Sequence, residues 1–263
     1  MSGFRPDLVV DFLTANDRTA FLTWLSRARW RVAYCKHRGL SAKNRLFTHV
    51  AEPNPKDHMV MQQLAALSVI GLMPRDTTLS FPVSASDRSA VARLVAGAGP
   101  LVHVHPVSRL EAKCWPDESM AELLEQMGRR GLTPVLTASS APVERERVQR
   151  LLALAKTRCL DLSGQISIRQ LGALSERAKC FVGVDSAPMH IAAAVGTPVI
   201  GLFGPSSEYL WHPWCERKLV LSQGLPCRLP CKYKRTCTTY ECLKTLSPDM
   251  VMPKVLAFLD EIS

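Results

Sequence analysis

The sequence predicts an α/β protein built from two doubly wound, parallel-sheet domains, and three observations support this prediction. Apolar runs of strand length alternate with segments of helical periodicity, an order that favours parallel strands joined by helices. The alternation is interrupted once, by small and helix-breaking residues within 78–100. The chain has 263 residues, of which 47% are hydrophobic, and can therefore bury one large core or two modest ones.

The first predicted domain covers residues 1–95. The segments "PDLVVDFL" and "RVAYC" have the length and composition of strands, and "TAFLTWLSRA" between them has helical spacing. His58–Leu72 is expected to form an amphipathic helix that ends near Gly71, and one more helix precedes the boundary.

The second predicted domain, residues 96–246, is more regular. Five strands, from "LVHVHP" to "PVIGLFG", alternate with four helices, which predicts a doubly wound sheet. Ligands of such sheets bind beyond the carboxyl ends of the strands. The tail, residues 247–263, is expected to form an amphipathic helix with Ser247 as its cap, placed to pack back on the first domain.

The charge of the chain indicates an acidic partner. The formal net charge is +10, and basic residues concentrate in 27–45 and 228–235. Such charge suits binding to nucleic acid, an anionic membrane surface or a phosphorylated substrate. The alternative is that the two basic segments are solvated surface with no binding role. No recognised nucleic-acid-binding module accompanies it, so no nucleic-acid partner is predicted. No apolar run is long enough for a membrane span or a secretory signal, and a cytoplasmic protein is expected.

The nine cysteines show no disulfide pattern, because their number is odd and their spacing scattered. Four of them cluster with three, five and four residues between neighbours, which is looser than the usual zinc-binding spacing. We therefore predict ordinary reduced thiols and no metal. A metal site is the alternative, and its ligands would be Cys227, Cys231, Cys237 and Cys242.

Polar residues follow two of the predicted strands. "HPVSRLEAKCWP" places Ser108, Arg109 and Lys113 in a strand-to-helix turn, where two cations and a hydroxyl suit an anion, although solvated surface charge is the alternative. "TASSAPVERER" places two serines before a helix and Glu144 in its first turn. An acidic residue there is favoured by the helix dipole alone, and it is also a residue that binds a ribose diol in nucleotide pockets.

The segment "VGVDSAPMH" is the most informative. Asp185 ends a buried strand, Ser186 stands at the N-cap position, and Pro188 lies in the first turn of the next helix. The free N–H groups and the positive end of the helix dipole form a site for a phosphate. The alternatives are a buried helix histidine for His190 and a simple cap for Asp185.

Together, "HPVSRLEAKCWP", "VGVDSAPMHIAAAVGTPVIGLFGPSS" and "WHPW" resemble the donor-binding half of the lipopolysaccharide heptosyltransferases, glycosyltransferase family 9, with most similarity to the heptosyltransferase III branch. The resemblance implies a GT-B-like fold of two Rossmann-like domains. It implies inverting, metal-independent and cofactor-free transfer of a heptose from ADP-heptose to the inner core of lipopolysaccharide. The acceptor would lie at the inner leaflet of the cytoplasmic membrane, where the basic surface could make peripheral contact.

The resemblance also implies roles for individual residues. Lys113 would hold the donor diphosphate with Ser108 and Arg109 near it, and Asp185 would orient the loop or the heptose hydroxyls. The phosphates would meet the start of the helix, and the ribose and nucleotide would meet a second group. The phosphate group consists of Ser186, Ala187, Met189 and His190, and the nucleotide group of Ser139, Ser140, Glu144 and Gly204.

The sequence departs from the family at its start. Family members open with a glycine-rich turn whose Gly-Asp pair supplies the presumed general base, and this chain has no such segment. The first domain is therefore expected to be truncated and the catalytic base to be absent, with Asp11 and Asp17 as the nearest acidic residues. A catalytically silent nucleotide-sugar-binding remnant and a GT-B epimerase or hydrolase of a nucleotide sugar are the alternative functions.

Overall fold

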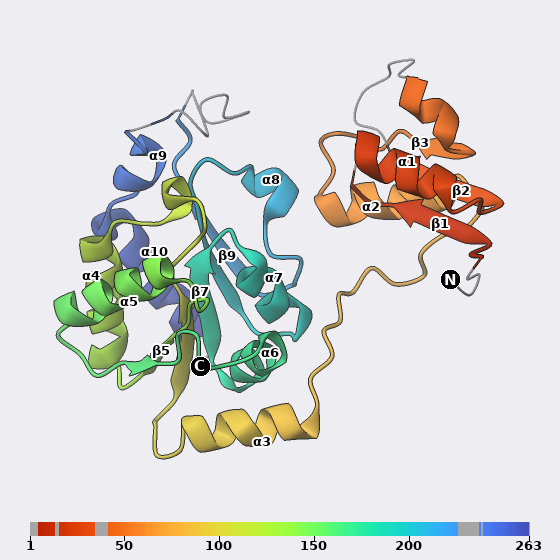
Figure 1. Ribbon diagram of the computed structural model, residues 1–263. Coiled ribbons are helices and arrows are strands. Elements are labelled where there is room, and N and C mark those ends of the chain that lie inside the picture. The colour runs from red at the N-terminus through yellow and green to blue at the C-terminus, as the bar shows by residue number, and fades with distance from the viewer. Residues whose placement is uncertain (1–4, 14–15, 35–41, 226–236, 238, 263) are drawn as a thin grey trace. The chain divides into compact units, whose positions relative to one another are not determined.

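The computed structural model describes residues 5–13, 16–34, 42–225, 237 and 239–262, and the chain divides into two compact units. Unit 1 is Met1–Thr77 and unit 2 is Thr78–Ser263. Both contain parallel sheets joined by helices (Figure 1), which confirms the predicted α/β class.

Unit 1 contains a three-stranded parallel sheet in the order β1-β2-β3. Its small core joins the second strand to the second helix through Val32, Tyr34, Met59 and Ala66. The Asn16 side chain caps the first helix by accepting from two of its N–H groups. The elements are β1 (Leu8–Asp11), α1 (Asp17–Leu25), β2 (Trp30–Tyr34), η1 (Ala42–Leu46), β3 (His49–Ala51) and α2 (Met59–Ser68).

Unit 2 contains a six-stranded parallel sheet in the order β6-β5-β4-β7-β8-β9. Counted within the unit, this is the strand order 3-2-1-4-5-6 of a Rossmann fold, whose direction reverses between β4 and β7. The elements are α3 (Ala85–Leu94), β4 (Leu101–His105), η2 (Glu111–Lys113), α4 (Asp117–Arg129), β5 (Thr133–Leu136), α5 (Pro142–Leu154), β6 (Leu160–Asp161), α6 (Ile168–Arg177), β7 (Cys180–Val184), α7 (Ala187–Ala194), β8 (Val199–Phe203), α8 (Glu208–Trp211), β9 (Lys218–Ser222), α9 (Glu241–Lys244) and α10 (Pro248–Glu261).

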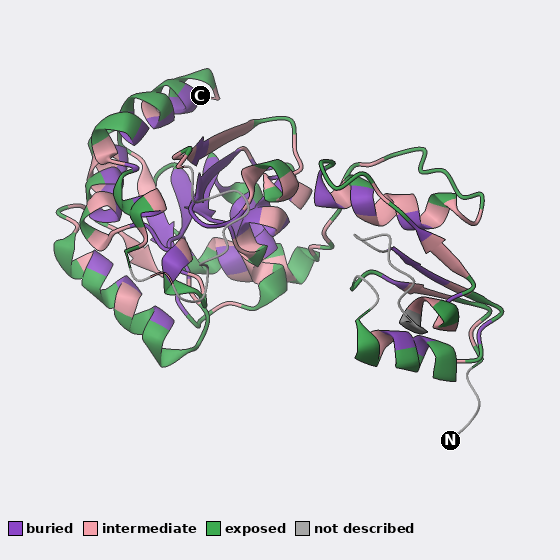
Figure 2. Ribbon diagram, turned by 90° about the horizontal axis from the view of Figure 1, so that it is seen from above, coloured by how far each residue is buried: buried purple, intermediate pink, exposed green. Residues whose placement is uncertain are grey.

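Helices cover both faces of the unit 2 sheet. Residues of α4, α5 and α10 pack on one face, where Val102 and Val104 of β4 contribute to the main core. On the other face, Leu101 packs with residues of α3 and α6, and α7 packs on β7 and β8. The strands β4, β7 and β8 are buried along their whole length (Figure 2), so side chains reach solvent only where these strands end.

The division between the units falls ahead of the expected boundary at residue 95, because α3 belongs to unit 2. Val91 and Val95 pack in the core with Leu101. The Arg88 guanidinium donates two hydrogen bonds, of 2.7 and 2.9 Å, to the carboxylate of Glu176 on α6. These contacts join residues far apart in sequence, which local periodicity does not report.

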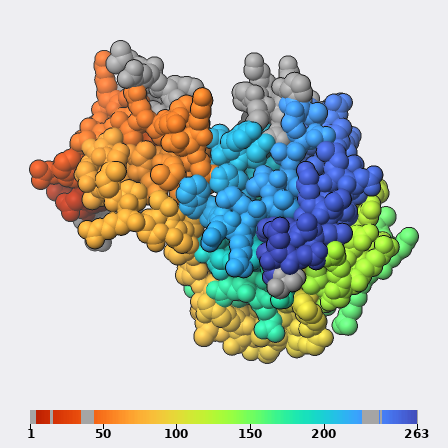
Figure 3. Space-filling view, turned by 180° about the vertical axis from the view of Figure 1, so that it is seen from behind, coloured from red at the N-terminus to blue at the C-terminus, as the bar shows by residue number. Residues whose placement is uncertain are grey.

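The C-terminal helix α10 also packs in unit 2, against α4 (Figure 3), and its expected contact with the first domain stays a prediction. Val251 and Val255 are fully buried in the main core. The indole Nε1 of Trp115 donates to the carbonyl of Leu246, at 2.8 Å, and fixes the segment that leads into the helix. Ser247 stands at the N-cap position, but its side chain makes no capping hydrogen bond.

Candidate active site

A cavity of ≈ 1260 Å³ lies in unit 2, at the carboxyl ends of β4, β5, β7 and β8. This is the edge where the strand order reverses between β4 and β7, the place at which Rossmann sheets bind ligands. Most of the predicted site residues line it. They are Ser108, Arg109, Lys113, Ser139, Glu144, Asp185, Ser186, Ala187 and His190.

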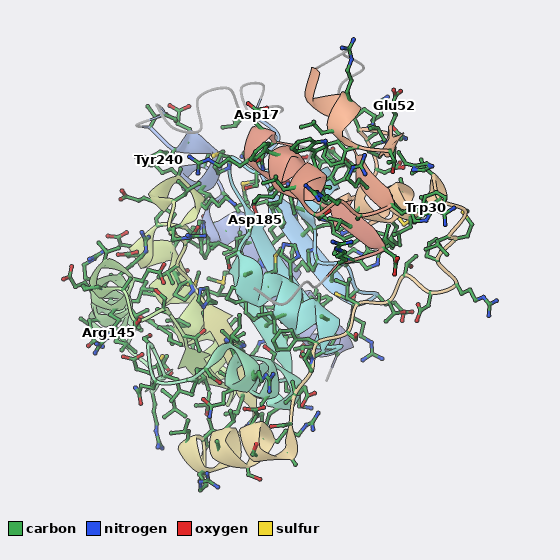
Figure 4. All side chains as sticks on the ribbon, turned by 45° about the vertical axis from the view of Figure 1, so that its right-hand side comes forward. Asp17, Trp30, Glu52, Arg145, Asp185 and Tyr240 are labelled. Carbon is green, nitrogen blue, oxygen red and sulfur yellow. The ribbon has the colours of Figure 1, made fainter. Side chains whose placement is uncertain are left out.

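An ion pair between Lys113 and Asp185 is the main charged feature of the cavity. The Lys113 Nζ atom is 2.7 Å from Oδ2 of Asp185 and also donates to the backbone carbonyl of Asp185 at 3.3 Å. Lys113 ends the short helix η2, and Asp185 lies where β7 passes into α7 (Figure 4), so two loops 72 residues apart meet here.

Asp185 is held in its ionised form. Burial alone would raise the pKa of this carboxyl, but the His190 imidazole and the Lys113 ammonium outweigh it and lower the pKa to about 2. The Nε2 atom of His190 lies 3.8 Å from Oδ1 of Asp185, whereas Lys113 contacts Oδ2. Three residues that the sequence named separately, Lys113, Asp185 and His190, therefore form one electrostatic cluster.

The start of α7 faces the same cavity. Ser186 is the N-cap residue in extended conformation, and its hydroxyl donates to the carbonyl of Val184 at 3.2 Å rather than capping the helix. Ala187 occupies the first helical position, where a backbone N–H has no intrahelical partner. Pro188 lacks an N–H altogether, so in the first turn of the helix the N–H of Ala187 is a donor that can meet a ligand.

Glu144 lies in the first turn of α5 and is buried, with only 8% of its surface exposed. Its Oε2 atom accepts the backbone N–H of Ser139 at 2.9 Å, which ties the loop after β5 to the helix. The carboxylate therefore stands at a fixed place on the cavity wall.

Three predicted residues do not line the cavity. Met189 is fully buried in a core cluster with Phe181 and Phe203, because the helix turns this side chain toward the sheet. Gly204 packs against Leu243, and a Cβ added to it would lie 2.7 Å from that side chain. Ser140 lies beside the backbone of residue 164 and outside the lining. The glycine at 204 thus leaves room for Leu243 of α9.

Several cavity residues were not predicted. His105 and Thr137 form part of the floor, Ile166 and Leu171 part of an apolar wall, and Trp211 lies beside His190 with ring centroids 6.3 Å apart. The sequence carried one signal for the floor: "LVHVHP" places two histidines two residues apart in a buried strand, hence on one face of it.

The remaining candidates lie elsewhere. Cys227 and Cys231 fall outside the described residues, so the metal alternative that joins them to Cys237 and Cys242 stays a prediction. Asp11 and Asp17 belong to unit 1: Asp11 is buried at the end of β1, where Oδ1 accepts the N–H of Leu13 at 2.7 Å, and Asp17 begins α1.

The family model of glycosyltransferase family 9 (heptosyltransferase) matches residues 7–241 of this chain. The chain belongs to that family. Its sequence is 32% identical to lipopolysaccharide heptosyltransferase 3 of Escherichia coli over 234 residues, which cover 87% of this chain and 68% of the relative. The family resemblance read from "VGVDSAPMH" and its neighbours is thereby confirmed.

Solved structures share the fold of this family 9 member. A family 9 glycosyltransferase from Veillonella parvula superimposes with a TM-score of 0.79 at 22% identity, covering 98% of this chain and 74% of the other. An Escherichia coli heptosyltransferase solved with ADP superimposes with a TM-score of 0.68 at 20% identity, covering 98% and 73%. The predicted GT-B-like fold class is confirmed by this likeness.

Proposed function

We propose that this chain transfers a heptose from ADP-heptose to the inner core of lipopolysaccharide. Membership of the heptosyltransferase family and the name of its E. coli relative support the reaction class. ADP and an ADP-heptose analogue were bound in solved neighbours, which supports the donor. The observation that carries the proposal is the meeting of Lys113 with the start of α7 in a cavity at the strand reversal.

The reaction that this cavity suits is a displacement at the anomeric carbon. An acceptor hydroxyl attacks from the face opposite the leaving ADP, which inverts the configuration, and the bond to the diphosphate oxygen breaks. Negative charge grows on the diphosphate as that bond breaks. A fixed ammonium and a helix N-terminus placed around that charge stabilise the transition state more than the ground state, which is what lowers the barrier.

The positions of several residues in the cavity support the individual roles proposed for them. Lys113 and the N–H of Ala187 take the diphosphate, with Ser108 and Arg109 on the loop beside them. Glu144 accepts from the ribose hydroxyls, and the stabilisation by Lys113 and the helix end takes the place of a divalent metal. We assign no residue as the base that removes the proton of the acceptor.

We propose that the acceptor is a heptose-bearing core glycolipid at the inner leaflet and that the protein reaches it from the cytoplasmic side. In the described part of the chain, no helix is both long and apolar enough to cross a membrane. The net charge of +10 favours a peripheral contact with anionic headgroups, which increases the concentration of enzyme near its acceptor.

The test is an assay with ADP-heptose, with and without heptose-bearing core acceptor, on the wild type and on Lys113→Ala. We expect acceptor-dependent transfer by the wild type, and a loss of ADP affinity of roughly 10- to 100-fold in the variant, the size of one charge-assisted contact. Lys254→Ala is the matched control, because Lys254 is an exposed cation on α10.

Each other outcome identifies an alternative. Release of ADP without acceptor would indicate a hydrolase or epimerase of the nucleotide sugar, and donor binding without any turnover would indicate a silent remnant. Unchanged ADP affinity in Lys113→Ala, with its folding verified by circular dichroism, would overturn the placement of the diphosphate.

A further inference from the structure

Four polar side chains form a buried chain of hydrogen bonds beneath the cavity. Ser175 Oγ on α6 lies 2.8 Å from Nδ1 of His103, whose Nε2 lies 2.8 Å from Oγ1 of Thr137. The same Thr137 oxygen lies 2.9 Å from Nδ1 of His105. Ser175 and His103 are fully buried, and Thr137 is exposed by 1%. This series of hydrogen bonds therefore runs from the buried interior of unit 2 to His105, which lines the cavity.

Counting donors and acceptors shows which group donates in each of these hydrogen bonds. In the described part of the protein, the Ser175 hydroxyl has His103 as its single side-chain partner, so its proton goes to Nδ1 of His103; otherwise a buried O–H would have no acceptor. His103 then carries its proton on Nε2 and donates to Thr137. The Thr137 hydroxyl has two acceptors within reach, Nδ1 of His105 at 2.9 Å and the carbonyl of Val104 at 3.4 Å, and the shorter one is favoured.

This direction leaves the proton of His105 on Nε2. His105 lines the cavity with 7% of its surface exposed, and among the described residues none is hydrogen-bonded to its Nε2 atom. The ring thus presents one N–H donor to the cavity, although nine-tenths of the residue is buried. Because Nε2 opens into the cavity and no protein group accepts from it among the described residues, it is available to a ligand that brings an oxygen acceptor.

The donor is neutral. Burial lowers the pKa of His105 to about 4, against the raising effect of the Glu144 carboxylate on α5. Burial, with the neighbouring His105, lowers the pKa of His103 well below its ordinary value. Of the other charged groups that line the cavity, Lys113 and Asp185 pair with each other, and Arg109 lies on the loop after β4. His105 can therefore contact a ligand without adding a charge to the site.

We propose that His105 is a ligand-binding residue that donates a hydrogen bond from Nε2 to an oxygen of the bound nucleoside diphosphate, and that Thr137, His103 and Ser175 are positioning residues that fix its tautomer. The inference rests on the proposed function, because it takes ADP as the occupant of the cavity. The positioning residues act through His105, since the chain of hydrogen bonds leads to its Nδ1 atom.

The first test measures the tautomers directly, by ¹⁵N NMR of the histidine rings in the full chain without ligand. We expect His103 and His105 both as neutral Nε2–H forms at pH 7. In Thr137→Val, His105 should become a mixture of tautomers, since its Nδ1 loses the hydroxyl that donates to it. An Nδ1–H form of His105 in the wild type would overturn the direction assigned to these hydrogen bonds.

The second test is calorimetric titration with ADP. We expect His105→Asn to weaken ADP binding about 10-fold or more and Thr137→Val to weaken it several-fold, from the loss and the misplacement of one hydrogen bond to a charged group. Thr197→Val is the matched control. Thr197 is also a buried threonine; its hydroxyl donates to the backbone carbonyl of Ser175, and it makes no hydrogen bond to His103, Thr137 or His105.

The outcomes separate the two levels of the proposal. If the wild type binds ADP and Lys113→Ala loses it, but His105→Asn binds ADP as the wild type does, the ligand contact is wrong and the proposed function stands. If Thr137→Val and Thr197→Val weaken binding equally, the effect is general destabilisation and the positioning role is wrong. If the wild type does not bind ADP at all, the proposed function itself fails.

Discussion

Lowering the pH from 7 to 4.5 should destabilise unit 2, because it holds neutral histidines in its interior. The pKa of His105 is lowered by burial to about 4 in the folded protein, whereas an exposed histidine has an ordinary value of 6.5. The unfolded chain therefore binds a proton below pH 6.5 that the folded chain does not bind until about pH 4. The stability contributed by neutral His105 is fully present above pH 6.5 and is lost as the pH falls from 6.5 toward 4.

The magnitude follows from the two pKa values. The full effect of His105 is about 3 kcal/mol, of which about 2 kcal/mol is lost by pH 4.5. His103 adds to it in the same direction, since burial also lowers its pKa. The lowered pKa of Asp185 acts in a separate window, because its contribution is present above its unfolded value and is lost only as the pH falls toward about 2.

The assay is urea unfolding at both pH values, followed by hydrogen–deuterium exchange of peptides that cover β4 and β7, so that unit 2 is observed by itself. His105→Gln, which cannot titrate, should be less stable at pH 7 but should lose about 2 kcal/mol less on acidification. His49→Gln in unit 1 is the control and should leave the pH dependence of unit 2 unchanged. Equal losses in the wild type and His105→Gln would refute the reasoning, because His105 would then be protonated in the folded state.

Two further predictions concern packing. Gly183→Ala should destabilise unit 2 by about 1–3 kcal/mol, since the new Cβ would lie 2.7 Å from the backbone oxygen of His105; calorimetry should show this drop in Tm, with Gly224→Ala, which meets nothing within 4 Å, as a near-neutral control. Trp115→Phe should cost about 1–3 kcal/mol in urea unfolding, because the buried carbonyl of Leu246 loses its donor, and a variant as stable as the wild type would contradict this.

Periodicity predicted most of the fold because most elements are long and bury one face. The strands around "LVHVHP" and "CFVGVD" were correctly predicted, since an apolar run bounded by turn residues has few other uses. Two short strands, β3 and β9, were missed: "HVA" is too short for a pattern, and "KLVLS" follows a stretch of aromatic and charged residues. The place of α3 was not predictable locally, because it depends on α6 more than 70 residues later.

The residues of the candidate site were also predicted only in part. The rule that ligands bind at strand ends was sufficient to bring Lys113, Glu144 and Asp185 into one cavity. It was not sufficient for Met189, whose side chain packs into the core, or for Gly204, where Leu243 of α9 fills the adjacent space. Both outcomes depend on packing partners elsewhere in the sequence, which a local motif does not report.

Under the proposed function, the charges of the cavity would favour one orientation of the donor. Asp185 stays ionised, with a pKa of about 2, so a diphosphate placed against it would meet a buried negative charge at close range. We therefore propose that the diphosphate contacts Lys113 and the N–H of Ala187, where the helix end is positive. The sugar hydroxyls, which can donate to a carboxylate, would then face Asp185. In this proposed arrangement Asp185, which pairs with Lys113, would also disfavour the reversed orientation of the donor.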